Sequence, residues 1–195
     1  MRRHFEALHI LAAILWFTAL MSAGLGAAVA FPVLKPLNPH LPDFAQFPGE
    51  HWRIAGGAIG NRLFTISDIF QLAGPIVCTL FFIPILLRER STAAEAPRLG
   101  GITIARSVIL LLACALGLYQ SLILGPDMRH TIEAFWSAAR AGNLDTAASL
   151  QAAFDASHPK ARIIMESSAL LTFLLIILGL WSRRVPCRVP CSVLL

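Results

Sequence analysis

Residues 63–87 read LFTISDIFQLAGPIVCTLFFIPILL, and Asp68 is the single charged side chain in this run. The hydrocarbon core of a bilayer is about 30 Å thick, so a helix that rises about 1.5 Å per residue needs roughly 20 apolar residues to cross it. This run is long enough and apolar enough to do so. It therefore predicts a transmembrane helix.

Three more runs of this kind occur in the chain, at residues 5–31, 104–124 and 163–181. With 56% hydrophobic residues and a mean hydropathy of +0.69, the 195-residue chain is too apolar for a water-soluble domain. We expect an all-α fold, an integral membrane four-helix bundle formed by residues 1–182. A basic cytoplasmic tail, residues 183–195, follows it.

The distribution of Lys and Arg predicts how the spans are oriented. Nine of the 16 basic residues lie in three short segments: the N-terminus, the connection between the second and third spans, and the tail. The other seven are spread over two connections of about twice that length. We therefore expect both termini in the cytoplasm, residues 32–62 and 125–162 outside, and a bacterial inner membrane around the bundle. Because the basic residues flank apolar runs, the net charge of +5 does not indicate a nucleic-acid partner.

The two outer connections differ in composition. Residues 32–62 contain five prolines and several aromatic side chains, which favours an extended segment lying at the lipid headgroups. Residues 127–156 carry apolar side chains at helical spacing, interrupted at Gly142-Asn143. We expect the second connection to form an outer helical hairpin between the third and fourth helices.

Short motifs are spread over residues 5–181: LHILAAILWF (8–17), Phe31-Pro32, AGGAIGNRLF (55–64), YQSLILGP (119–126), AAFDASHPKAR (152–162) and Ser167-Ser168. Together they resemble the transmembrane protein 205-like family. The resemblance implies a four-span membrane domain, and it implies no established substrate or reaction. Members often carry a His shortly before the small polar residues of the fourth helix, where this chain has Ile164 or Met165.

Polar residues near one end of the spans are the candidate site. Asp68, Gln120 and Glu166 lie at similar depth in the outer leaflet, because the second and fourth helices run inward while the third runs outward. An ionisable side chain inside a span is costly, so we expect these three to converge in the bundle interior. Carboxylates with neutral oxygen donors suit a hard cation or a proton. The candidate ligand-binding residues are Asp68, Gln71, Gln120, Glu166 and Ser167.

The same residues admit a structural interpretation. Near the helix ends, the carboxylates could instead form interfacial ion pairs with Arg62 and Arg162 that fix helix packing. A solute-handling bundle should bury Asp68 and Glu166 facing each other. An accessory subunit should pair its carboxylates with Arg and expose an apolar face rich in small residues. Ser22, Gly26 and Ala30 give the first helix a small-residue face, which we expect to pack within the bundle.

His9 on the first span raises a third possibility, a haem-associated membrane protein. Haem usually needs a second axial ligand at matching depth, and the other spans contain no His. We therefore expect no cofactor, and His9 to reach the inner interface or to pair with Glu6. Cys187 and Cys191 in the tail make an incomplete metal set.

Three functions follow from these patterns. The first is binding or passage of a cation, proton or small polar solute at the outer polar cluster. The second is a structural or accessory subunit of a larger membrane complex, and the third is haem association. No nucleotide motif, nucleophile triad or complete metal motif supports an enzyme, and no catalytic residue is assigned. The expected partners are the lipid bilayer and other membrane subunits or further copies of this chain.

Overall fold

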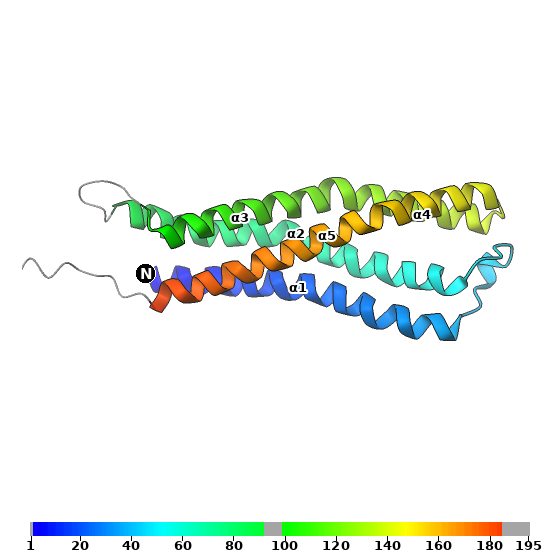
Figure 1. Cartoon of the computed structure of the whole chain (residues 1–195), viewed down its shortest axis with the longest axis horizontal. Helices are drawn as coiled ribbons and strands as arrows, with labels where there is room; N and C mark the ends of the chain where they lie inside the picture. The colour runs from blue at the N-terminus through cyan, green and yellow to red at the C-terminus, as the bar shows by residue number, and fades with distance from the viewer. Residues whose placement is uncertain (1, 92–98, 185–195) are drawn as a thin grey trace, which may run out of the picture.

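The computed structural model describes residues 2–91 and 99–184, which form helices and no strand (Figure 1). The long helices are α1 (Arg2–Leu37), α2 (His51–Ser91), α3 (Gly101–Tyr119), α4 (Gly125–Arg140) and α5 (Leu144–Arg184). A short 3₁₀ turn, η1 (Pro42–Phe44), lies between α1 and α2. A π-helical turn, η2 (Gln120–Leu124), joins α3 directly to α4.

The chain therefore forms four long rods, since α3, η2 and α4 make one helix of 40 residues. All four rods are long and apolar enough to cross a membrane, which agrees with an integral membrane protein. A helix of this length is about 60 Å long, twice the thickness of the hydrocarbon core. The bundle is consequently much taller than the apolar part of a bilayer.

The segment at residues 32–62 differs from the expected extended structure. α1 continues through Pro32 and Pro36, and α2 already begins at His51, so only residues 38–50 separate the two helices. A proline inside a helix costs about 3 kcal/mol, and apolar packing offsets this here because the Phe31 ring lies against Gly56 and Gly60 of α2. α1 ends at Leu37, and the next residue, Asn38, has a φ of 36°, the left-handed conformation that Asn tolerates.

Residues 127–156 are helical on both sides of a turn at residues 141–143, where Gly142 has a φ of +70°. These helical segments are continuous with the rods. They do not form a separate layer across the end of the bundle (Figure 1). The beginning of α1 and the end of α5 lie together at the end of the bundle opposite this turn (Figure 1).

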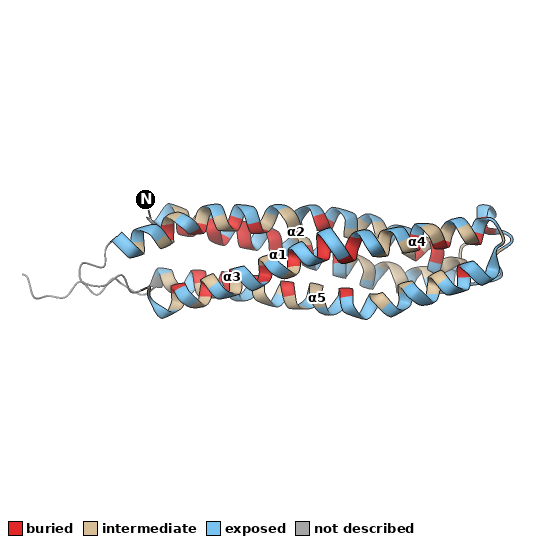
Figure 2. Cartoon of the chain, turned by 90° about the horizontal axis from the view of Figure 1, so that it is seen from above, coloured by how far each residue is buried: buried red, intermediate tan, exposed pale blue. Residues whose placement is uncertain are grey.

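Two apolar clusters hold the rods together. The larger one lies in the half of the bundle near the N-terminus and centres on Trp16, Phe82 and Leu175. The smaller one lies near η1 and the α4–α5 turn and centres on Phe44, Ile54 and Phe135. Figure 2 shows the buried residues as a stripe along the inner faces of the rods, with exposed residues outside.

α5 crosses the bundle obliquely. Near the N-terminus it packs on α1, where Gly179 lies against Ile10, and towards the other end it packs on α4 (Figure 1). The second half of α1 is left with α2 as its main neighbour. Along this half, four apolar side chains one turn apart are 53–67% exposed, and we call them the α1 stripe: Leu25, Val29, Val33 and Leu37.

Candidate functional site

A layer of polar side chains crosses the bundle interior between the two apolar clusters and near the π turn. Its members come from four elements, and all except Arg129 are buried. We call this set the polar layer: Ser67, Asp68 and Gln71 of α2, Gln120 and Ser121 of η2, Arg129 of α4 and Ser168 of α5.

An ion pair between Asp68 and Arg129 lies at one side of the polar layer. Gly125 makes room for it, since a Cβ there would lie 3.0 Å from Asp68 Oδ2 and 3.3 Å from Arg129 Nη1. The Ser121 hydroxyl donates a long hydrogen bond of 3.5 Å to the Asp68 carbonyl. The carboxylate of Asp68 is thus neutralised by a guanidinium from the next rod.

Helix register places Gln71, Gln120 and Ser168 at one level. Gln71 lies against Gly117, one turn before Gln120. On the other side, Arg106 contacts Ser182 of the antiparallel α5. Both helices rise by the same amount per residue, and Gln120 is as far from Arg106 in the sequence as Ser168 is from Ser182. Gln120 and Ser168 therefore lie at the same level of the bundle.

The π turn forms one wall of the polar layer. Gln120, Ser121, Leu124 and Gly125 are all buried in or next to this turn, where the i→i+5 hydrogen bonding widens the helix. Such turns occur frequently at functional sites.

Acceptor atoms in the polar layer have unused hydrogen-bonding capacity. The Oε1 atoms of Gln71 and Gln120 and the Oγ atoms of Ser67 and Ser168 are buried and have no partner within the described part of the chain. In addition, Pro75 has no N–H to donate to the Gln71 carbonyl, so that helical hydrogen bond is missing. Buried acceptors of this kind suit a guest that donates hydrogen bonds.

Glu166 and Ser167 occupy different positions from Asp68. The Glu166 side chain is 67% exposed, and Arg162 Nε lies 3.3 Å from its Oε1 on the same helix. Ser167 is half-buried. The expected convergence of Asp68, Gln120 and Glu166 in the interior is therefore wrong for Glu166, because sequence spacing gives depth along a helix and leaves its rotation open.

A second buried polar cluster, which the sequence did not predict, lies near the N-terminal end of the bundle. Arg106 of α3 and Glu6 of α1 form an ion pair of 3.0 Å, and their side chains are 1% and 4% exposed. Arg106 Nη1 also donates to Ser182 Oγ at 3.2 Å, and the guanidinium lies 4.9 Å from the centre of the Phe82 ring. The charge of Arg106 was counted with the connection that precedes the third span, and the side chain lies in the core.

His9 is fully buried beside this pair, so the expectation that it reaches the interface or pairs with Glu6 is wrong. Its Nδ1–H donates to the Cys78 carbonyl at 3.0 Å, and its ring packs against Phe82 at 5.1 Å. A porphyrin could reach the ring only if the helices separated. The packing of His9 therefore disfavours the haem interpretation.

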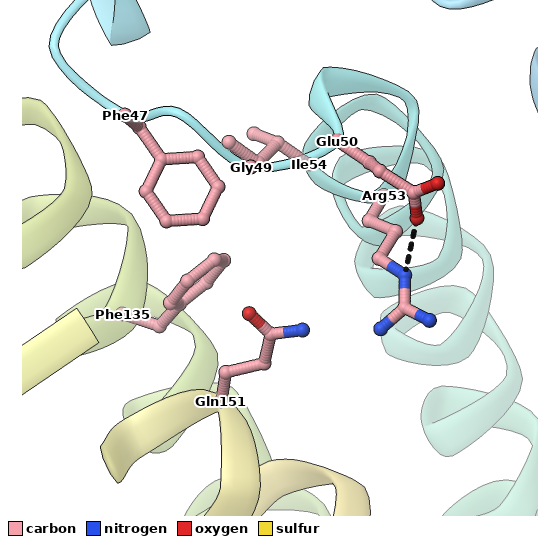
Figure 3. Close-up of a pocket in the computed structure, with 7 residues that line it drawn as sticks. All are labelled: Phe47, Gly49, Glu50, Arg53, Ile54, Phe135 and Gln151. Atoms are coloured by element: carbon pink, nitrogen blue, oxygen red, sulfur yellow. Dashed lines mark hydrogen bonds and ion pairs between the residues drawn. The ribbon is translucent and has the colours of Figure 1, made fainter. Parts of the chain in front are cut away.

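A shallow hollow of about 200 Å³ lies at the other end of the bundle, between residues 47–50, α2, α4 and α5 (Figure 3). The rings of Phe47 and Phe135 meet edge to face on one side at 5.7 Å. On the other side Arg53 Nε donates to Glu50 Oε2 at 3.1 Å, so the two charges satisfy each other. The hollow therefore offers an apolar wall and no free charge from this pair.

The described residues contain no group of three or more His, Cys, Asp or Glu placed to hold a metal ion. Cys78 and Cys114 are free thiols, whereas Cys187 and Cys191 lie outside the described residues. Comparison with family models, curated proteins and solved structures finds no match for this chain.

Proposed function

We propose that this protein is a structural or accessory subunit of a membrane complex. The observation that carries the proposal is that each of the three acidic residues in the apolar spans forms an ion pair with an arginine. Glu6 pairs with Arg106, Asp68 with Arg129 and Glu166 with Arg162. A carboxylate already neutralised by a guanidinium is a poor ligand for a cation, and its main effect is to fix how two helices pack.

The α1 stripe supplies the docking surface in this proposal. This part of α1 lies beside the beginning of α2, since Gly26 is next to Leu63 and Phe31 is next to Gly56. Leu25 and Val29 belong to the apolar run 5–31, whereas Val33 and Leu37 lie beyond it, beside the part of α2 that precedes the run 63–87. An exposed apolar patch that continues beyond the hydrocarbon marks a protein interaction site. The partner is an apolar surface on another membrane protein.

The remaining parts of the proposal concern placement in the membrane. Both termini are cytoplasmic and the membrane is a bacterial inner membrane, on the basis of the Lys and Arg distribution. α4 and the first half of α5 then form the outer helical hairpin, beside the exposed part of α1. A relationship to the transmembrane protein 205-like family, based on the short motifs, is compatible with this arrangement.

Site-specific photocrosslinking in native membranes tests the docking proposal. A photoreactive amino acid at Val29 or Val33 should give an adduct with a different membrane protein, identifiable by mass spectrometry. The same residue at Ala152 or Ala156, exposed positions on α5, is the matched control and should not give this adduct. Adducts with lipid alone, or with a second copy of this chain, would contradict the accessory-subunit proposal.

A second candidate function is supported by the unused acceptors of the polar layer. In this alternative, Gln71, Gln120 and Ser168 bind a small guest that donates hydrogen bonds, such as a hydrated proton or a small polar solute. Proteoliposomes containing a pH-sensitive dye test the proton case. Gradient loss that is abolished in Gln120→Leu and retained in Thr65→Val, an exposed control, would favour this function; gradient loss equal to that of protein-free vesicles would exclude proton passage.

A further inference from the structure

A groove on the outside of the bundle, between α1 and α2, shares only Ser67 with the polar layer and is separate from the α1 stripe. Its volume is about 320 Å³. Its rim residues Leu15, Ile66 and Phe70 are exposed to the surroundings of the bundle. The residues that line it are Leu15, Thr18, Ala19, Ser22, Ala23, Leu63, Ile66, Ser67 and Phe70.

The depth of the groove determines which molecules surround it. Its α1 wall lies in the apolar run 5–31 and its α2 wall in the run 63–87, so acyl chains are its immediate neighbours. A helix with its side chains is about 10–12 Å across, and a groove of this volume has room for one or two of its side chains. An acyl chain is narrow and can fill the same groove along its length.

The groove contains one polar group that points to a ligand. Ser67 Oγ belongs to the lining, its residue is only 3% exposed, and the oxygen has no hydrogen-bond partner in residues 2–91 and 99–184. The Ser22 hydroxyl, by contrast, already donates to the Thr18 carbonyl at 2.7 Å. Ser67 can donate to a carbonyl oxygen such as that of a lipid ester.

A free cation lies above this opening. Arg62 is exposed and directly precedes Leu63, where the apolar run begins, and it lies one turn before Ile66 on the same helical face. Three other arginines at this end of the bundle each form an ion pair with an acidic side chain: Arg53, Arg129 and Arg162. Arg62 has no ion pair or hydrogen bond among the residues that the structure describes. A guanidinium at the headgroup level binds phosphate through paired hydrogen bonds.

We infer that the α1–α2 groove binds one anionic phospholipid. One acyl chain lies between Leu15 and Phe70, an ester carbonyl accepts from the Ser67 hydroxyl, and the phosphate pairs with Arg62. The preference for an anionic headgroup follows from charge, because a zwitterionic headgroup brings its own cation next to Arg62. This site is independent of the accessory-subunit proposal, since the α1 stripe begins beyond the groove.

Native mass spectrometry of the full chain, released from vesicles of equal parts phosphatidylglycerol and phosphatidylcholine, tests the inference. The unmodified chain should retain about one phosphatidylglycerol. Arg62→Gln should lower the ratio of bound phosphatidylglycerol to phosphatidylcholine about fivefold, the value of one basic contact at a membrane surface. Lys160→Gln removes an exposed charge from α5 and should leave the ratio unchanged. Equal ratios in Arg62→Gln and the unmodified chain would overturn the headgroup assignment.

A second measurement tests the position of the acyl chain. Phosphatidylglycerol with a photoreactive acyl chain should label peptides containing residues 15–23 and 63–70. Ala19→Phe, which fills the groove, should abolish this label, and Ala28→Phe, an exposed position on the same helix, should retain it. Ser67→Ala, which removes the hydroxyl without adding volume, should weaken the label if Ala19→Phe fails to fold. Labelling spread evenly over the lipid-facing residues, or unaffected by all three variants, would overturn the inference.

Discussion

The buried Glu6–Arg106 pair gives the sharpest test of how the bundle is held together. In Arg106→Met the Glu6 carboxylate stays in the interior without its guanidinium partner, at a site where both side chains are almost fully buried. Breaking a buried pair by removing one partner costs about 3–5 kcal/mol. The Met side chain keeps much of the apolar contact with Phe82, so most of this cost comes from the loss of the ion pair with Glu6.

The assay is reversible unfolding of the purified protein in mixed micelles, followed by circular dichroism. Arg106→Met should lower the free energy of unfolding by about 3–5 kcal/mol, and the double variant Glu6→Gln/Arg106→Met should recover a large part of the loss because no charge is left buried. Arg162→Gln is the control, since the exposed Arg162–Glu166 pair contributes less than about 1 kcal/mol. If Arg106→Met and Arg162→Gln have equal effects, or the double variant is less stable than Arg106→Met, the interpretation of a buried charge pair is refuted.

Three further predictions concern other parts of the bundle. Gly125→Ala should destabilise the protein by about 1–3 kcal/mol in the same unfolding assay, because its Cβ would meet Asp68. Gly24→Ala is the control and should stabilise the protein by up to about 1 kcal/mol, because the Cβ there meets open space. Equal effects of the two substitutions would contradict the packing described. A cysteine at Ser149 should react with an impermeant thiol reagent added outside intact cells, and reaction only after permeabilisation would reverse the proposed orientation. The purified protein should show no Soret absorbance, and a Soret band that disappears in His9→Leu would restore the haem interpretation.

The sequence predicted the number and type of helices because membrane spans depend on length and apolar composition, which are local properties. It also located Asp68 and Gln120 at one depth, since depth follows from the rise per residue. It placed Glu166 in the same layer and was wrong about its direction. Rotation about the helix axis depends on which neighbours each face meets, and here α5 turns Glu166 outward to Arg162.

The two arginines that pair with acids of other helices were both counted with the connections. Arg129 lies beyond the apolar run 104–124, and Arg106, at the beginning of that run, was included in the basic count of the inner connection. Both belong to helices that continue beyond the apolar runs, and each meets an acid on another helix. Pro32 and Pro36 had the opposite effect, because they led to the prediction of an extended segment where α1 in fact continues. The cost of these prolines is outweighed by the contact of Phe31 with the glycines of α2.

The two ion pairs together define the position of the third rod. Arg106 links α3 to α1, and Arg129 links α4 to α2, so one continuous helix is tied to two different partners at two different heights. In a regular α-helix, the angle between two side chains is fixed by their separation in sequence. The π turn at residues 120–124 lies between the two arginines and changes that angle, because it adds a residue to one turn. The π turn therefore belongs to the packing of the bundle, and this accounts for it without requiring a guest in the polar layer.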